Sequence, residues 1–169
     1  MQALGLIWKD FGSASGVEEI RTPLREPVHF GARLLFNHWR VKQAAGGMVV
    51  GRDLPVRELT PALRNLILYE PLEGGHDFQV RLAGSANLRR FGRDVTGQRL
   101  SEMFEGDAFE WRRKTLANAL VTREHVSTDV LLKRSRGDSL RFEVLTLPVL
   151  NESGARWALG GIFYPDWVG

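Results

Sequence analysis

The sequence contains no cysteine. This absence excludes structural disulfides, thiolate metal sites and cysteine nucleophiles, and it fits a reducing compartment. The sequence also lacks a run of about 20 apolar residues, which a membrane-spanning helix needs. Residues 1–10 have no basic start and no long apolar stretch, so we expect no secretion signal. We therefore expect a cytoplasmic protein with no membrane partner.

An excess of charge of one sign is absent too. Lys and Arg number 23 against 20 Asp and Glu, which leaves a formal net charge of only +3. Opposite charges alternate along the chain, as in Arg52-Asp53 and Arg123-Glu124, a pattern typical of a solvated surface. Because a nucleic-acid groove needs clustered cations, we expect no nucleic-acid partner.

Motifs for catalysis or metal binding are missing as well. The four histidines, His29, His38, His76 and His125, have no pair at the helical i, i+4 spacing, so we predict no metal site. The segment 81–85 ends in Gly-Ser but lacks the first glycine of a nucleophile elbow. No glycine-rich phosphate loop is present. We therefore predict that the protein is not an enzyme.

The 169 residues suit one domain with an N-terminal extension. Residues 1–33 carry Gly, Ser and Pro without sustained periodicity, which predicts a partly flexible arm. Residues 34–58 begin with an apolar stripe at helical spacing that ends near Gly46-Gly47, followed by a turn-rich connector. Residues 59–169 form the folded domain in this interpretation.

The folded domain alternates between strand and helix patterns. Short helices are expected from residues 60, 85 and 100, and a longer one over 108–122. Strands are expected at 66–69, 78–83, 126–133, 140–150 and 157–164. The two strands before the helices and the three after them predict a five-stranded antiparallel sheet with helices on one face, an α+β fold. The apolar parity switches between Val144 and Leu145, which predicts a bulge there.

Short motifs accompany this order of elements. They are Trp39-Arg40, residues 51–57 (GRDLPVR), residues 77–85 (DFQVRLAGS), residues 91–97 (FGRDVTG) and the strand 145–151. Together they resemble the PAS superfamily, in particular small stand-alone bacterial PAS-like proteins with a helix ahead of the sheet. The resemblance runs from Leu34 to Tyr164.

This resemblance implies a sensory or regulatory domain whose curved sheet and helices enclose a pocket, with no catalytic residues. No output module is expected on the same chain, so a signal would pass by protein–protein contact. Haem held by a histidine of the long helix is not expected, because residues 108–122 contain none. A cysteine-adduct flavin is excluded by the missing cysteine. The cofactor stays unknown.

The pocket wall predicted on this basis combines inward strand positions with helix positions that face them. The residues are Phe78, Val80, Leu82, Asn87, Leu88, Phe91, Phe104, Trp111, Leu116, Leu120, Phe142 and Val144. Arg81, Asn87 and Trp111 are its polar candidates, and Arg81 has the alternative of lying on the outer face of the sheet. The same apolar residues also suit a filled core. A ligand-binding sensor and a structural interaction module with a filled pocket therefore both stay open, and an enzyme on a cone-shaped α+β fold is disfavoured.

The helix ahead of the sheet and its connector are the predicted partner interface. The residues are Leu34, Leu35, His38, Trp39, Arg52 and Arg57. We expect them to form a homodimer or to bind a regulatory protein. For Arg52 and Arg57, anchoring the helix through carboxylates is the alternative.

Overall fold

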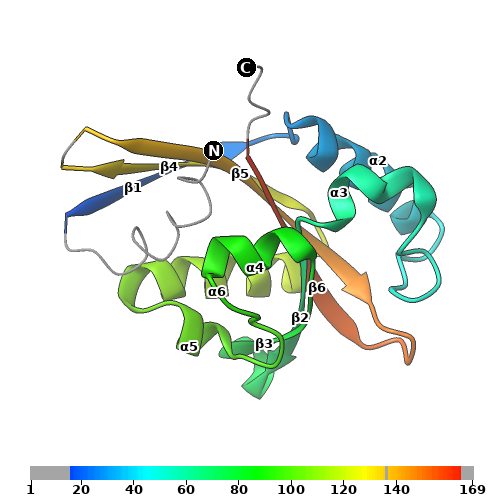
Figure 1. The fold of residues 1–169 in the computed structure, drawn as a ribbon. Helices are drawn as coiled ribbons and strands as arrows, with labels where there is room; N and C mark the ends of the chain where they lie inside the picture. The colour runs from blue at the N-terminus through cyan, green and yellow to red at the C-terminus, as the bar shows by residue number, and fades with distance from the viewer. Residues whose placement is uncertain (1–15, 136, 165–169) are drawn as a thin grey trace.

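An antiparallel sheet of six strands, in the order β1-β4-β5-β6-β2-β3, forms the middle of the molecule (Figure 1). The computed structural model describes residues 16–135 and 137–164. The strands are β1 (Val17–Leu24), β2 (Leu66–Leu72), β3 (Asp77–Ala83), β4 (Val126–Arg134), β5 (Ser139–Leu150) and β6 (Arg156–Phe163). The helices are α2 (Phe30–Ala44), α3 (Thr60–Leu63), α4 (Ser85–Phe91), α5 (Leu100–Met103) and α6 (Gly106–Thr122), with short turns η1 (Arg57–Leu59) and η2 (Glu73–Gly75). The predicted α+β class is confirmed.

The prediction of five strands was wrong, because β1 lies within the segment predicted as an arm. It pairs with β4 from Val17 opposite Arg134 to Leu24 opposite Ser127. Its pattern was hidden because two of its half-buried residues, Glu19 and Arg21, are charged. They bind Arg112 and Asp107 of α6 instead of packing as apolar side chains. Residues 1–15 of the predicted arm lie outside the described residues.

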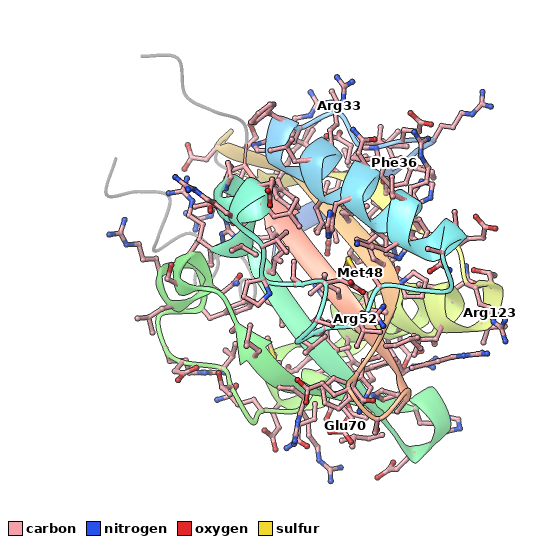
Figure 2. The ribbon with its side chains drawn as sticks, turned by 90° about the vertical axis from the view of Figure 1, so that its right-hand side faces the viewer. Arg33, Phe36, Met48, Arg52, Glu70 and Arg123 are labelled. Carbon is pink, nitrogen blue, oxygen red and sulfur yellow. The ribbon has the colours of Figure 1, made fainter. Side chains whose placement is uncertain are left out.

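Helices cover both faces of the sheet, with a separate apolar core on each side. Helices α4, α5 and α6 lie on one face, and α2 crosses the other in front of β5 and β6 (Figures 1 and 2). The first core includes Phe78 of β3 and Phe142 of β5. The second includes Leu35 of α2 and Leu147 of β5. The sheet is therefore the middle layer of a three-layer domain.

Strand β5 explains why the predicted bulge at Val144 and Leu145 was wrong. Its register with β4 and with β6 continues without a shift through both residues. Phe142 and Val144 pack into the core under α6, whereas Leu145 and Leu147 pack into the core under α2. Two-sided burial makes consecutive residues apolar, which in the sequence looks like a change of parity.

The bulge of this sheet lies instead between β2 and β3. Leu68 pairs with Leu82 but the next residue, Tyr69, pairs with Val80, so Arg81 has no residue opposite it. An extra residue in one strand turns the side chains that follow to the other face. Val80 therefore faces the α6 side, and Leu82 does not.

Helix α2 is fixed to the sheet at both ends. Its start is held by Glu143 of β5, whose carboxylate accepts hydrogen bonds from the backbone of Val28 and His29, both at 2.9 Å. Near its other end, Trp39 Nε1 donates to the Pro148 carbonyl at 2.8 Å. The helix begins at Phe30, four residues earlier than predicted. Within the described residues, we find no helix with the length and apolar character required to span a membrane.

Candidate functional site

A cavity of about 40 Å³ lies between α6 and the strands β2, β5 and β6. It is lined by Ile67, Tyr69, Phe91, Phe104, Trp111, Arg112, Thr115, Leu116, Val144, Thr146, Gly160, Gly161 and Ile162. A buried water takes roughly 10–15 Å³ by this measure, so the space suits about three waters. A drug-sized ligand fills roughly 300 Å³ or more. As it stands, the cavity matches a ligand of only a few atoms.

Two residues that line this cavity carry hydroxyl groups that form no hydrogen bond with a described residue. Tyr69 of β2 is 8% exposed and Thr146 of β5 is 2% exposed. A third hydroxyl in the lining, that of Thr115, is already used because it donates to the Trp111 carbonyl at 2.8 Å. The hydroxyls of Tyr69 and Thr146 are therefore free to bind a water or a polar ligand.

Arg112 of α6 brings a positive charge to the same cavity. Its side chain is 13% exposed and donates to the Ala108 carbonyl at 2.9 Å and to Glu19 Oε1 at 3.4 Å. The guanidinium carbon lies 4.1 Å from the centre of the Phe104 ring. Burial lowers the pKa of Arg112, and the carboxylate of Glu19 opposes this shift. The ion pair with Glu19 thus supports a charged arginine in an otherwise apolar wall.

The charge of Arg112 is connected to the edge of the sheet through an ionic network. Arg21 of β1 pairs with Glu19 and with Asp107, each at 3.0 Å. The Arg21 guanidinium also lies 4.7 Å from the centre of the Trp111 ring. Strand β1 and the first half of α6 are therefore joined by charges that stand directly behind the cavity wall.

Five of the twelve residues predicted for the pocket wall line this cavity, namely Phe91, Phe104, Trp111, Leu116 and Val144. Others belong to the neighbouring core: Phe78, Val80 and Phe142 are at most 1% exposed, and Leu120 packs against them. These four residues support the wall from behind.

Three predicted wall residues lie elsewhere, and for them the prediction was wrong. Leu82 is 54% exposed because the bulge at Arg81 turns it away from α6, and Leu88 is 55% exposed on the outer side of α4. Asn87 is fully buried, but its amide donates to the carbonyls of Leu66 at 3.0 Å and Gly84 at 3.2 Å. Asn87 therefore connects α4 to β2 instead of facing the cavity.

Sequence reasoning missed the polar and small residues of the wall. Tyr69 and Thr146 lie in segments predicted as strands and Arg112 in the predicted long helix, but none of them was named as a wall residue. The Gly160-Gly161 pair in β6 was an available signal, because a glycine inside a strand often marks a close approach. A Cβ at Gly160 would lie 3.1 Å from the Tyr69 ring, so the missing side chain lets that ring lie across β6.

The predicted partner interface is contradicted at two residues. Leu35 and Trp39 are 0% and 4% exposed because they pack in the core between α2 and the sheet. Leu34 is half-buried against the same core. His38 Nε2 lies 3.0 Å from the Asp53 carbonyl. The sheet-facing side of α2 therefore has no free apolar surface for a second chain.

The two predicted connector arginines differ in their contacts. Arg52 pairs with the neighbouring carboxylate of Asp53 at 2.9 Å. This arginine, together with the Val49 N–H, lowers the pKa of Asp53 to about 2. Arg57 is exposed and forms no ion pair with a described carboxylate. In the described part of the chain, no three His, Asp or Glu residues are grouped as metal ligands.

Comparison with known proteins identifies the class to which this fold belongs. A family model described as a PAS domain matches residues 28–164. The chain therefore belongs to the PAS domain family. The search of curated proteins found no match.

Several solved structures are similar to this chain. The blue-light photoreceptor Aureochrome1 LOV in its light state has 16% identity and a TM-score of 0.42, and the match covers 67% of this chain and 90% of that one. The light-state dimer of the fungal blue-light photoreceptor Vivid has 19% identity and a TM-score of 0.44, with 82% and 97% covered. An RNA-binding light-oxygen-voltage receptor has 15% identity and a TM-score of 0.44, with 95% and 42% covered.

Proposed function

We propose that this protein is a PAS-type sensory domain that binds a small molecule in the cavity under α6 and passes the signal by contact with a partner protein. The observation that supports the proposal is that two mostly buried residues of the cavity lining, Tyr69 and Thr146, carry hydroxyls without a hydrogen-bond partner among the described residues. Apolar pockets with a few convergent polar groups are the usual form of a ligand site.

The chemistry of the lining defines the class of ligand. Both hydroxyls can donate a hydrogen bond, and Arg112 adds a positive charge close by. The remaining wall is apolar, with aromatic side chains of Phe91, Phe104 and Trp111. This combination suits a compact molecule with hydrogen-bond acceptors, such as a short carboxylate. A larger ligand requires movement of one of these aromatic side chains.

A role as an enzyme is not supported by the same lining. It contains no carboxylate and no imidazole among the described residues, so general acid–base catalysis lacks its usual groups. Ligand binding changes the domain only if the ligand has different affinities for two conformations. A bound anion would alter the ionic network of Arg112, Glu19 and Arg21, because the anion competes with Glu19 for the positive charge of Arg112.

An interaction module with a filled pocket is the second candidate function. The small volume of the cavity, about 40 Å³, favours it. In that case the domain acts through its surface alone, and the two hydroxyls bind only water.

A thermal-shift screen of small carboxylates separates the two functions. For a sensor, a ligand raises the melting temperature of the wild type by mass action. The rise is lost in Thr146→Val, which keeps the shape of the side chain but removes its hydroxyl. It persists in Thr22→Val, the same substitution at an exposed position of β1. The absence of any shift, together with a native mass spectrum showing only the bare chain, favours the interaction module.

A further inference from the structure

Four arginines around α4 form no ion pair with a described carboxylate. Several arginines elsewhere on the surface are paired, as Arg141 with Asp129 at 2.9 Å or Arg113 with Glu110 at 3.0 Å, and those without a described carboxylate partner, such as Arg33 and Arg156, do not surround one helix. The unpaired group consists of Arg64, Arg89, Arg90 and Arg93, and is called the α4 arginine cluster below. Within residues 16–135 and 137–164, no acidic side chain forms an ion pair with the cluster.

Arg90 is the buried centre of the cluster. It is 7% exposed, and its guanidinium donates to the side-chain oxygens of Asn65 at 2.6 Å and Asn87 at 3.3 Å. It also lies 4.6 Å from the centre of the Tyr164 ring. All three partners are neutral, so they orient the guanidinium without cancelling its charge. Burial lowers the pKa of Arg90 to about 10, and the nearby charge of Arg64 contributes to the shift.

The other three arginines are exposed around this centre. The carbonyl of Arg64 accepts a hydrogen bond from the backbone of Ala86 at 3.0 Å, which places Arg64 beside the first turn of α4. Arg89 is on the exposed side of the last turn, and Arg93 follows the helix, where its side chain donates to Gln98 at 3.2 Å. The neighbouring carboxylate of Asp94 accepts from the Thr96 N–H at 3.0 Å and pairs with none of them.

An exposed leucine lies on α4 next to one arginine of the cluster. Leu88 directly precedes Arg89 and is 55% exposed. Carboxylates bind arginine through paired hydrogen bonds, and an apolar contact bordered by charges is typical of a protein interface. Affinity for nucleic acid depends on the number of phosphates that cations neutralise, and this surface offers only three exposed arginines.

We infer that the α4 arginine cluster, with Leu88, is a docking surface for an acidic segment of a partner protein that carries an apolar side chain. The surface does not depend on a ligand in the cavity, so it can be tested separately from the proposed ligand binding. Electrostatic attraction brings the segment to α4, and Leu88 supplies an apolar contact that fixes its position.

The test uses the full chain and a short fluorescent peptide of glutamates around one leucine. We expect saturable binding that weakens with added salt. The double variant Arg64→Glu, Arg89→Glu loses about tenfold or more in affinity, because two attractive contacts become repulsive. The matched control Arg33→Glu, Arg156→Glu changes the same net charge at exposed, unpaired arginines elsewhere, with Arg33 on α2 (Figure 2), and binds within about twofold of the wild type.

Backbone amide shifts measured by NMR then locate the site. The inference requires that the peptide changes the amide chemical shifts of residues 85–93 and Arg64 at lower concentrations than those of other residues. It is overturned if the shifts lie on another surface, if the peptide does not bind at low salt, or if both double variants bind equally. Stronger binding to single-stranded DNA or to phosphatidylserine vesicles overturns the choice of a protein segment. If the charge-reversed variant does not fold, Arg64→Gln, Arg89→Gln replaces it, with a smaller expected loss of about threefold.

Discussion

The hydroxyl of Tyr69 on β2 and the guanidinium of Arg112 on α6 line the same cavity. Burial raises the pKa of Tyr69, and the positive charge of Arg112 opposes this rise. The two side chains come from elements on opposite sides of the cavity, and the tyrosine brings a hydroxyl with no described partner. The two side chains add polar groups to a lining that is otherwise mostly apolar.

Removal of the Tyr69 hydroxyl is predicted to separate stability from ligand binding. In Tyr69→Phe, the free energy of unfolding without ligand stays within about 1 kcal/mol of the wild type, because no hydrogen bond within the described chain is lost. The stabilisation by a small carboxylate falls. Urea denaturation with and without the ligand measures both quantities. A variant that is strongly destabilised without ligand would show that the hydroxyl has a structural partner.

A methyl group at Gly84 is predicted to destabilise the fold strongly. A Cβ there would lie 2.5 Å from the carbonyl oxygens of both Leu63 and Arg64. These are backbone atoms at the junction of α3 and α4, so they cannot move aside as a side chain does. Gly84→Ala should lower the free energy of unfolding by about 2 kcal/mol or more. Ser85→Ala, at the next and exposed position, should change it by less than about 1 kcal/mol.

The core under α2 gives a test of the predicted homodimer. Leu35→Ala removes a fully buried side chain and should lower the free energy of unfolding by about 2–5 kcal/mol. It should leave the mass in solution unchanged, because Leu35 packs inside its own chain. Light scattering measures the mass. Val41→Glu probes the exposed side of α2, where Val41 is 68% exposed. If Leu35→Ala converts a dimer into a monomer and Val41→Glu does not, Leu35 lies at an interface between two chains.

The pair of Arg52 and Asp53 predicts a dependence of stability on acid. The pKa of Asp53 falls from an ordinary 3.8 to about 2 in the folded chain. A carboxylate with a lowered pKa stabilises the folded state above its ordinary value, and this contribution is lost as the pH falls through its folded value. The urea midpoint of the wild type should therefore exceed that of Asp53→Asn near neutral pH, and the difference should shrink between about pH 4 and pH 2. Parallel pH curves would contradict this assignment.

The order of elements was predictable because it depends on local patterns. Strand alternation and helix spacing predicted β2 to β6 and the five helices α2 to α6, because each of these elements has apolar residues at the period of its type. Strand β1 was missed because Glu19 and Arg21 occupy its half-buried positions. Their partners, Arg112 and Asp107, are some 90 residues away in sequence, so no local pattern reveals them.

The site was predictable only in its apolar part. Phe104 and Val144 were found because large apolar side chains at inward positions mark a core or a cavity. Thr146 was not, because its role depends on the absence of a partner for its hydroxyl, which requires coordinates. Leu82 was predicted on the wrong face of the sheet because of the bulge at Arg81. One extra residue turns the side chains on its far side to the other face, and the sequence pattern does not reveal it.

The position of the sheet between two helical layers has a consequence for how the domain tolerates change. The side chains under α2 and those under α6 are separated by the sheet backbone and belong to different cores. Substitutions on the two sides, such as Leu147 and Leu116, should therefore have additive effects on stability, because residues without shared partners seldom couple. The two cores can therefore change independently in sequence. The core under α6 is under selection for what the cavity holds, whereas the core under α2 is under selection only for how firmly α2 is attached.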